Sequence, residues 1–159
     1  MTDLQFLYGQ TRSMRADLLA FLAPLPEAVL GATLPEYGQG SLLSTLTHVA
    51  DCYGGWVGRT LLEEDWAFAD GPDDLTALGE RFCRVDALLE RALVCARMQT
   101  GEKFQGVGWA ENLGVVTARW LVLHPVTHEF HHKGQVVTLL RRLGHPVTVD
   151  LDLPPPAGW

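Results

Sequence analysis

The sequence has no long apolar run, no CxxC motif and no excess of basic residues. A membrane-spanning helix needs about 20 consecutive, predominantly apolar residues, so we expect no membrane partner. The N-terminal segment places charges inside its apolar pattern, which does not fit the layout of a signal peptide. The three cysteines (Cys52, Cys83 and Cys95) cannot all pair, and we therefore expect reduced thiols in the cytoplasm.

Basic residues are few in comparison with acidic ones. Twelve Lys and Arg residues stand against nineteen Asp and Glu residues, which gives a net charge of −7. Nucleic-acid binding depends on Lys and Arg side chains that neutralise phosphates, so we expect no nucleic-acid partner. Low-complexity tracts and internal repeats are also missing. With 159 residues, 47% of them hydrophobic, the chain is expected to form one globular domain over residues 1–159.

Apolar residues recur at steps of three and four in four stretches, which is the period of an amphipathic helix. The expected helices span residues 3–23, 41–63, 74–97 and 117–144. Between the last two lies a long connection, residues 99–116, in which apolar residues no longer recur at helical spacing. This connection has room for a short hairpin. Four helices without a convincing sheet predict an all-α fold, a four-helix bundle.

The expected helix ends carry residues that commonly cap helices. At the starts these are Asp3, Ser41 and Asp73 or Asp74, and at the last end it is Gly144, which is followed by Pro146. Gly54 and Gly55 interrupt the second helix, at a cost of about 1 kcal/mol each relative to Ala. They predict the close approach of a neighbouring segment.

Four of the six histidines fall within nine residues of the last helix: His124, His128, His131 and His132. Burying several imidazoles without partners costs a few kcal/mol each, and a metal ion would satisfy them. His128 and His132 are spaced i, i+4 and project from successive turns, so they can hold one ion at ~2.0–2.1 Å. His128 with His131, at i, i+3, is an alternative pair, and histidines that are hydrogen-bonded or at the surface are the non-metal interpretation.

Two imidazoles alone hold a divalent ion weakly, so a third ligand is needed. His48 is the only histidine elsewhere within an expected helix, and it falls at the edge of the apolar arc, just beyond Cys52. An edge position suits a residue that faces a groove. Imidazole suits Zn, Ni, Cu and Fe, and the choice among these and Mn stays open.

Three further residues are candidate catalytic groups: Asp51, Glu129 and Gln135. Residues 128–132 match H-E-x-x-H, in which the Glu is the general base of a metalloprotease. The longer protease pattern requires Gly and His where this chain has Gln135 and Thr138, so a peptidase is disfavoured. A di-iron site is excluded because no second Glu-x-x-His is present. Asp51, one turn after His48, either orients that imidazole or is solvated, and Gln135 either lines the pocket or packs.

The lone histidine in LTHVADCYGGW, followed about eighty residues later by HEFHHKGQVVTLLRRLG, resembles the DinB/YfiT-like superfamily. The resemblance implies a four-helix bundle, often a homodimer, with a mononuclear site formed by His48, His128 and His132. Related families include thiol-dependent transferases that use bacillithiol, mycothiol or glutathione, and a maleylpyruvate isomerase. Lys133 replaces the commoner Arg, and His124 with Pro125 departs from the expected pattern.

Three neutral imidazoles leave a divalent ion its charge and an open position. Such an ion lowers the pKa of bound water or deprotonates a coordinating thiol. With no strong carboxylate nearby, the favoured function is thiol-dependent S-transfer to a small molecule, with one divalent metal ion per chain and a low-molecular-weight thiol as co-substrate. The alternatives are a metal-dependent hydrolase with Glu129 as base, and a non-catalytic metal-binding or stress-response protein. Broad apolar arcs on the helices predict a homodimer.

Overall fold

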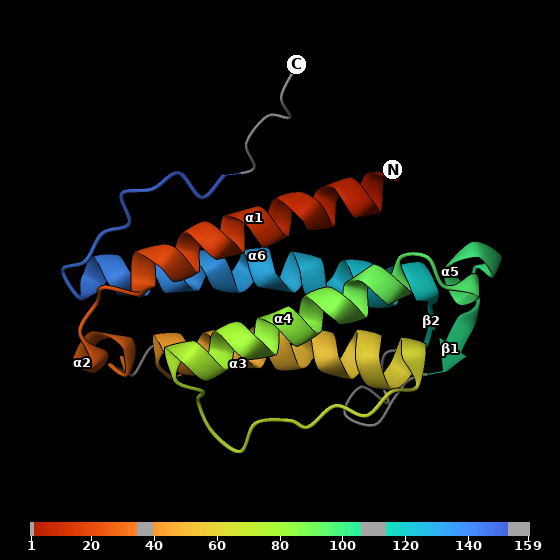
Figure 1. Ribbon diagram of the computed structural model, residues 1–159, viewed down its shortest axis with the longest axis horizontal. Helices are drawn as coiled ribbons and strands as arrows, with labels where there is room; N and C mark the ends of the chain where they lie inside the picture. The colour runs from red at the N-terminus through yellow and green to blue at the C-terminus, as the bar shows by residue number, and fades with distance from the viewer. Residues whose placement is uncertain (1, 35–39, 106–113, 153–159) are drawn as a thin grey trace.

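In the part of the chain that the structure describes, four long helical segments, here called rods, lie roughly along the longest axis of the molecule (Figure 1). In this computed structural model the described residues are 2–34, 40–105 and 114–152. The rods are α1 (Asp3–Leu22), α3 (Leu42–Tyr53) with its continuation η1 (Gly54–Leu62), α4 (Leu75–Ala92) and α6 (Ala118–Arg142). The shorter elements are α2 (Glu27–Leu30), α5 (Ala96–Thr100), β1 (Lys103–Gln105) and β2 (Val115–Thr117).

The rods pack as a bundle around one apolar core. Helix α1 contacts α4 and α6, and α3 contacts the same two helices from the other side. The largest fully buried side chains include Met14, Leu22, Tyr53, Leu89 and Leu121, which come from all four rods. The predicted all-α four-helix bundle is therefore confirmed. No described helix has the length and apolar character needed to cross a membrane.

Most helix ends follow the capping residues of the sequence. Ser41 caps α3 and Asp74 caps α4, because each side chain accepts a hydrogen bond from a backbone N–H group in the first turn of its helix. Gly144 follows α6 with φ 85°, a left-handed conformation that favours glycine at a helix end. The start of α1 differs from the prediction, because Thr2 caps this helix in place of Asp3.

Two of the expected helices change character along their length. The helix predicted over 41–63 is α-helical only to Tyr53 and continues as the π-helix η1, in which Thr60 Oγ1 donates to the Gly55 carbonyl at 3.0 Å. The helix predicted over 74–97 ends at Ala92, and α5 begins after a short turn. This break brings Arg97 to the end of η1, where its guanidinium donates to the Leu61 carbonyl at 2.9 Å.

The long connection before α6 contains the hairpin for which the sequence leaves room. Strands β1 and β2 pair antiparallel, with Phe104 opposite Val116. The intervening residues 106–113, and the end of the Pro-rich tail at 153–159, lie outside the described residues. The short helix α2 was not anticipated. The hairpin leads directly into α6, the helix that carries four histidines.

Gly54 is the position where a neighbouring segment approaches closely, as the sequence predicted. A Cβ atom added there would lie 2.1 Å from the Trp66 indole. We expect Gly54→Ala to lower the free energy of unfolding by about 1–3 kcal/mol, since the indole must move. Gly79→Ala in α4 is the matched control, because nothing lies within 4 Å of its added Cβ, and it should stabilise by up to about 1 kcal/mol. Urea denaturation measures both, and equal effects would contradict the prediction.

Candidate metal centre

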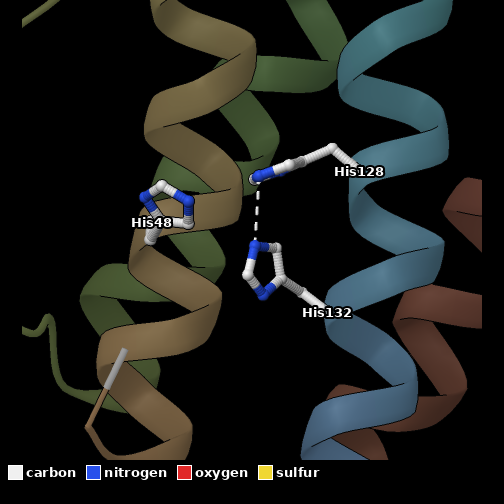
Figure 2. Close-up of side chains that lie close together, drawn as sticks. All are labelled: His48, His128 and His132. Carbon is white, nitrogen blue, oxygen red and sulfur yellow. Dashed lines mark hydrogen bonds between the residues drawn. The ribbon is translucent and has the colours of Figure 1, made fainter. Parts of the chain in front are cut away.

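Three histidines from two helices converge on one point between α3 and α6 (Figure 2). His48 comes from α3, and His128 and His132 come from successive turns of α6. One ring nitrogen of each lies within 4.8 Å of the others. The centroid of the His48 ring lies 5.0 Å from the ring centroid of His128 and 5.0 Å from that of His132. The structure thus brings together the three ligands that the sequence proposed.

The spacing of two of these imidazoles, His128 and His132, and the charge state of all three fit a divalent metal ion. The Nε2 atoms of His128 and His132 are 3.1 Å apart. Two nitrogens bound to one tetrahedral ion at ~2.0–2.1 Å would be about 3.3 Å apart. Burial lowers the pKa of His48 and of His132, and burial together with the neighbouring histidines lowers the pKa of His128 to about 3. The imidazoles are therefore neutral at pH 7 and can offer lone pairs.

Gln135 fixes the position of the proton on one of these histidines. Its Oε1 lies 2.7 Å from Nδ1 of His132, and an amide oxygen only accepts, so Nδ1 carries the proton. The unprotonated Nε2 of His132 then faces His128, which is the arrangement of a metal ligand oriented by a hydrogen bond on its other nitrogen. The Gln135 amide nitrogen lies 3.2 Å from Nε2 of His131, which is exposed and outside the three-histidine group. The Nδ1 of His128 is buried and has no hydrogen-bond partner among the residues that the structure describes.

Glu129 is buried on another side of α6 and is held by groups from other helices. Arg15 of α1 donates to both of its oxygens, from Nε at 2.8 Å and Nη2 at 3.0 Å. The Tyr53 hydroxyl donates to Oε2 at 2.7 Å. Burial lowers the pKa of Arg15, but the Glu129 carboxylate and the neighbouring Tyr8 and Tyr53 together raise it to well above its ordinary value, so that the guanidinium stays charged. Both oxygens of Glu129 are thus committed to an ion pair inside the bundle.

Arg15 escaped the sequence analysis, although the sequence contains a signal for it. It lies in the apolar stripe of α1, next to Met14 and three residues before Leu18, and all three side chains are buried. A charged residue in such a stripe needs a buried partner, because an unpaired buried charge is very costly. The Arg15 guanidinium also donates to Asp86 at 2.8 Å and lies 4.4 Å from the centroid of the Phe82 ring.

Asp51 holds the strap, residues 63–74, which connects η1 to α4 along the side of α3 (Figure 1). Its carboxylate accepts from Trp66 Nε1 at 2.7 Å, from the Ala69 backbone at 3.0 Å and from Arg81 at 2.9 Å. None of these donors is His48, although the negative charge of Asp51 raises the pKa of His48 against the effect of burial. A surface hollow of about 280 Å³ lies between the strap and α3, with His48 and Asp51 in its lining.

Comparisons with known proteins identify a matching family and a solved structure with a similar fold. The sequence profile of the DinB family matches residues 1–154. A crystal structure of a candidate DinB family member from Exiguobacterium sibiricum 255-15 has a similar fold, with a TM-score of 0.70 and 16% sequence identity. The similarity covers 96% of this chain and 99% of that chain. No curated protein matches the sequence significantly.

Proposed function

We propose, from the premise that this chain belongs to the DinB family, that it binds one divalent metal ion through His48, His128 and His132 and catalyses thiol-dependent S-transfer to a small electrophile. The observation that carries the proposal is the convergence of three neutral imidazoles. Within the described residues, no carboxylate joins this group. A donor set of this kind leaves the ion its full charge and an open position.

Two buried arginines offset part of the negative charge close to the ligands, which helps an anionic co-substrate to bind. Glu129 and Asp51 are the carboxylates nearest to the ligands in sequence, and each is paired with a buried arginine, Arg15 and Arg81 respectively. Each arginine also pairs with a second carboxylate, Asp86 or Asp73, so it offsets only part of the negative charge that Glu129 or Asp51 would direct against a thiolate at the site. A bound divalent ion would supply Lewis acidity, which would lower the pKa of a coordinating thiol so that the thiol releases its proton to solvent near neutral pH. Gln135 contributes by holding His132 in the tautomer that can bind the ion.

Hydrolysis is less well supported than S-transfer. A metal-dependent hydrolase benefits from a general base beside the attacking water. Both oxygens of Glu129 are engaged by Arg15 and Tyr53, and both oxygens of Asp51 accept hydrogen bonds from the strap. We therefore propose positioning roles for these two carboxylates: Glu129 fixes α6 against α1, and Asp51 fixes the strap against α3.

A conjugation assay tests the proposed chemistry. We expect metal-loaded protein to accelerate conjugation of monochlorobimane with bacillithiol or glutathione, and the acceleration to fall to background in His48→Ala, because two imidazoles hold the ion weakly. His145→Ala, which changes a histidine beyond the end of α6, should retain the activity. Fluorescence of the bimane conjugate gives the rate. Ester or amide hydrolysis without a thiol, lost in a folded Glu129→Gln variant, would instead establish a hydrolase.

A further inference from the structure

The three-histidine group is one end of a longer row of side chains. Helices α3 and α6 run antiparallel and pack side by side (Figure 1). Residues four apart lie on the same face of a helix. On α3 such a row contains His48 and Cys52, and Trp56 follows in the π-helix η1. On α6 it contains Trp120, His124, His128 and His132. The two rows contact each other through histidines at one end and through Trp56 and Trp120 at the other end.

Ring contacts join the aromatic end to the metal ligands without a break. Trp120 stacks on His124, with centroids 4.6 Å apart and an interplanar angle of 16°. Trp56 meets Trp120 edge-on at 5.2 Å and His124 at 5.5 Å. The His124 ring then lies 5.7 Å from that of His128. We call Trp56, Trp120 and His124 the aromatic shelf.

The shelf differs from an ordinary core cluster in its exposure and its position. Trp56 is buried, but Trp120 and His124 remain partly exposed although each makes ring contacts. Four residues of α-helix advance ~6 Å, so His124 and Trp120 lie ~6 Å and ~12 Å along α6 from His128. One or two rings attached to a metal-binding group would span this distance. Aromatic side chains favour stacked or edge-on contact with other rings.

We propose that the aromatic shelf binds an aromatic group of a ligand whose anionic end is held by the metal ion. This inference rests on the metal site proposed above, and it specifies the substrate class: small molecules that carry a planar, apolar group beside the reacting atoms. Trp120 and His124 would then be specificity-determining residues, since they touch the part of the ligand that does not react.

A pair of probes tests the shelf separately from the metal. Acetohydroxamate and benzohydroxamate bind metal ions through the same group and differ in the ring. Titration of Co²⁺-loaded protein, followed by the visible absorption of cobalt, gives both dissociation constants. We expect benzohydroxamate to bind about threefold to tenfold more tightly than acetohydroxamate. In Trp120→Ala this preference should fall towards one, while acetohydroxamate affinity stays unchanged.

Control variants make each outcome decisive. Leu123→Ala removes an exposed apolar side chain from the same stretch of α6 and should keep the full preference. If Trp120→Ala fails to fold, Trp120→Leu, which keeps apolar bulk but no ring, provides the same comparison. An equal preference in the wild type and in the Trp120 variant would overturn the shelf and leave the metal site standing. Failure of the wild type to take up Co²⁺ would overturn the metal site and the shelf with it.

Discussion

Replacing His132 with alanine is expected to reduce the metal content from about one ion per chain to a trace. The substitution removes one of three ligands and the only one whose tautomer is fixed by Gln135. Loss of an orienting partner alone typically costs 10–100-fold in metal affinity, so loss of the ligand should exceed about 100-fold. Elemental analysis after dialysis gives the metal content. The helical circular dichroism should be largely intact, since the ring, although buried, belongs to the histidine group and not to the apolar core cluster.

Two further variants provide comparisons for the loss of metal in His132→Ala. Gln135→Ala keeps all three imidazoles but releases Nδ1 of His132, so an intermediate loss, about 10–100-fold, is expected. His145→Ala lies outside the three-histidine group and should retain the ion. Full metal retention in His132→Ala would refute the assigned ligand set.

The second large effect concerns stability. Arg15→Met should lower the free energy of unfolding by about 3–5 kcal/mol, because it leaves the Glu129 carboxylate buried without its counter-ion. Arg15 and Glu129 are only 3% and 5% exposed as side chains. Urea denaturation measures the change. The double variant Arg15→Met/Glu129→Leu should recover much of the loss, since replacing both members of a buried pair with apolar groups is often neutral.

An exposed ion pair in the same protein is the matched control. Arg91 and Glu64 are 2.6 Å apart, and their side chains are 50% and 43% exposed. Arg91→Met should cost less than about 1 kcal/mol, because surface ion pairs contribute little. Equal destabilisation by Arg15→Met and Arg91→Met would show that burial of the Arg15–Glu129 pair does not have the stated effect.

Helix positions were largely predictable because a buried face imposes its period on the sequence. The helix expected over 117–144 is observed as Ala118–Arg142, and the one expected over 3–23 as Asp3–Leu22. The change from α to π geometry after Tyr53 was not predictable from this pattern. Apolar residues continue at similar spacing through it, and the change coincides with Trp66 packing on Gly54, a contact between segments.

The sequence by itself determined that His128 and His132 lie on the same side of their helix, because a spacing of four residues is sufficient for this, but it left His131 open as an alternative partner of His128. Only the tertiary structure decided what lies opposite each polar residue. It brought His48 to the pair by packing α3 on α6, and it committed Glu129 to Arg15, 114 residues away, and Asp51 to Arg81, 30 residues away. Local spacing fixes the face on which a side chain lies, whereas its partner, and hence its role, depends on the helix packed against that face.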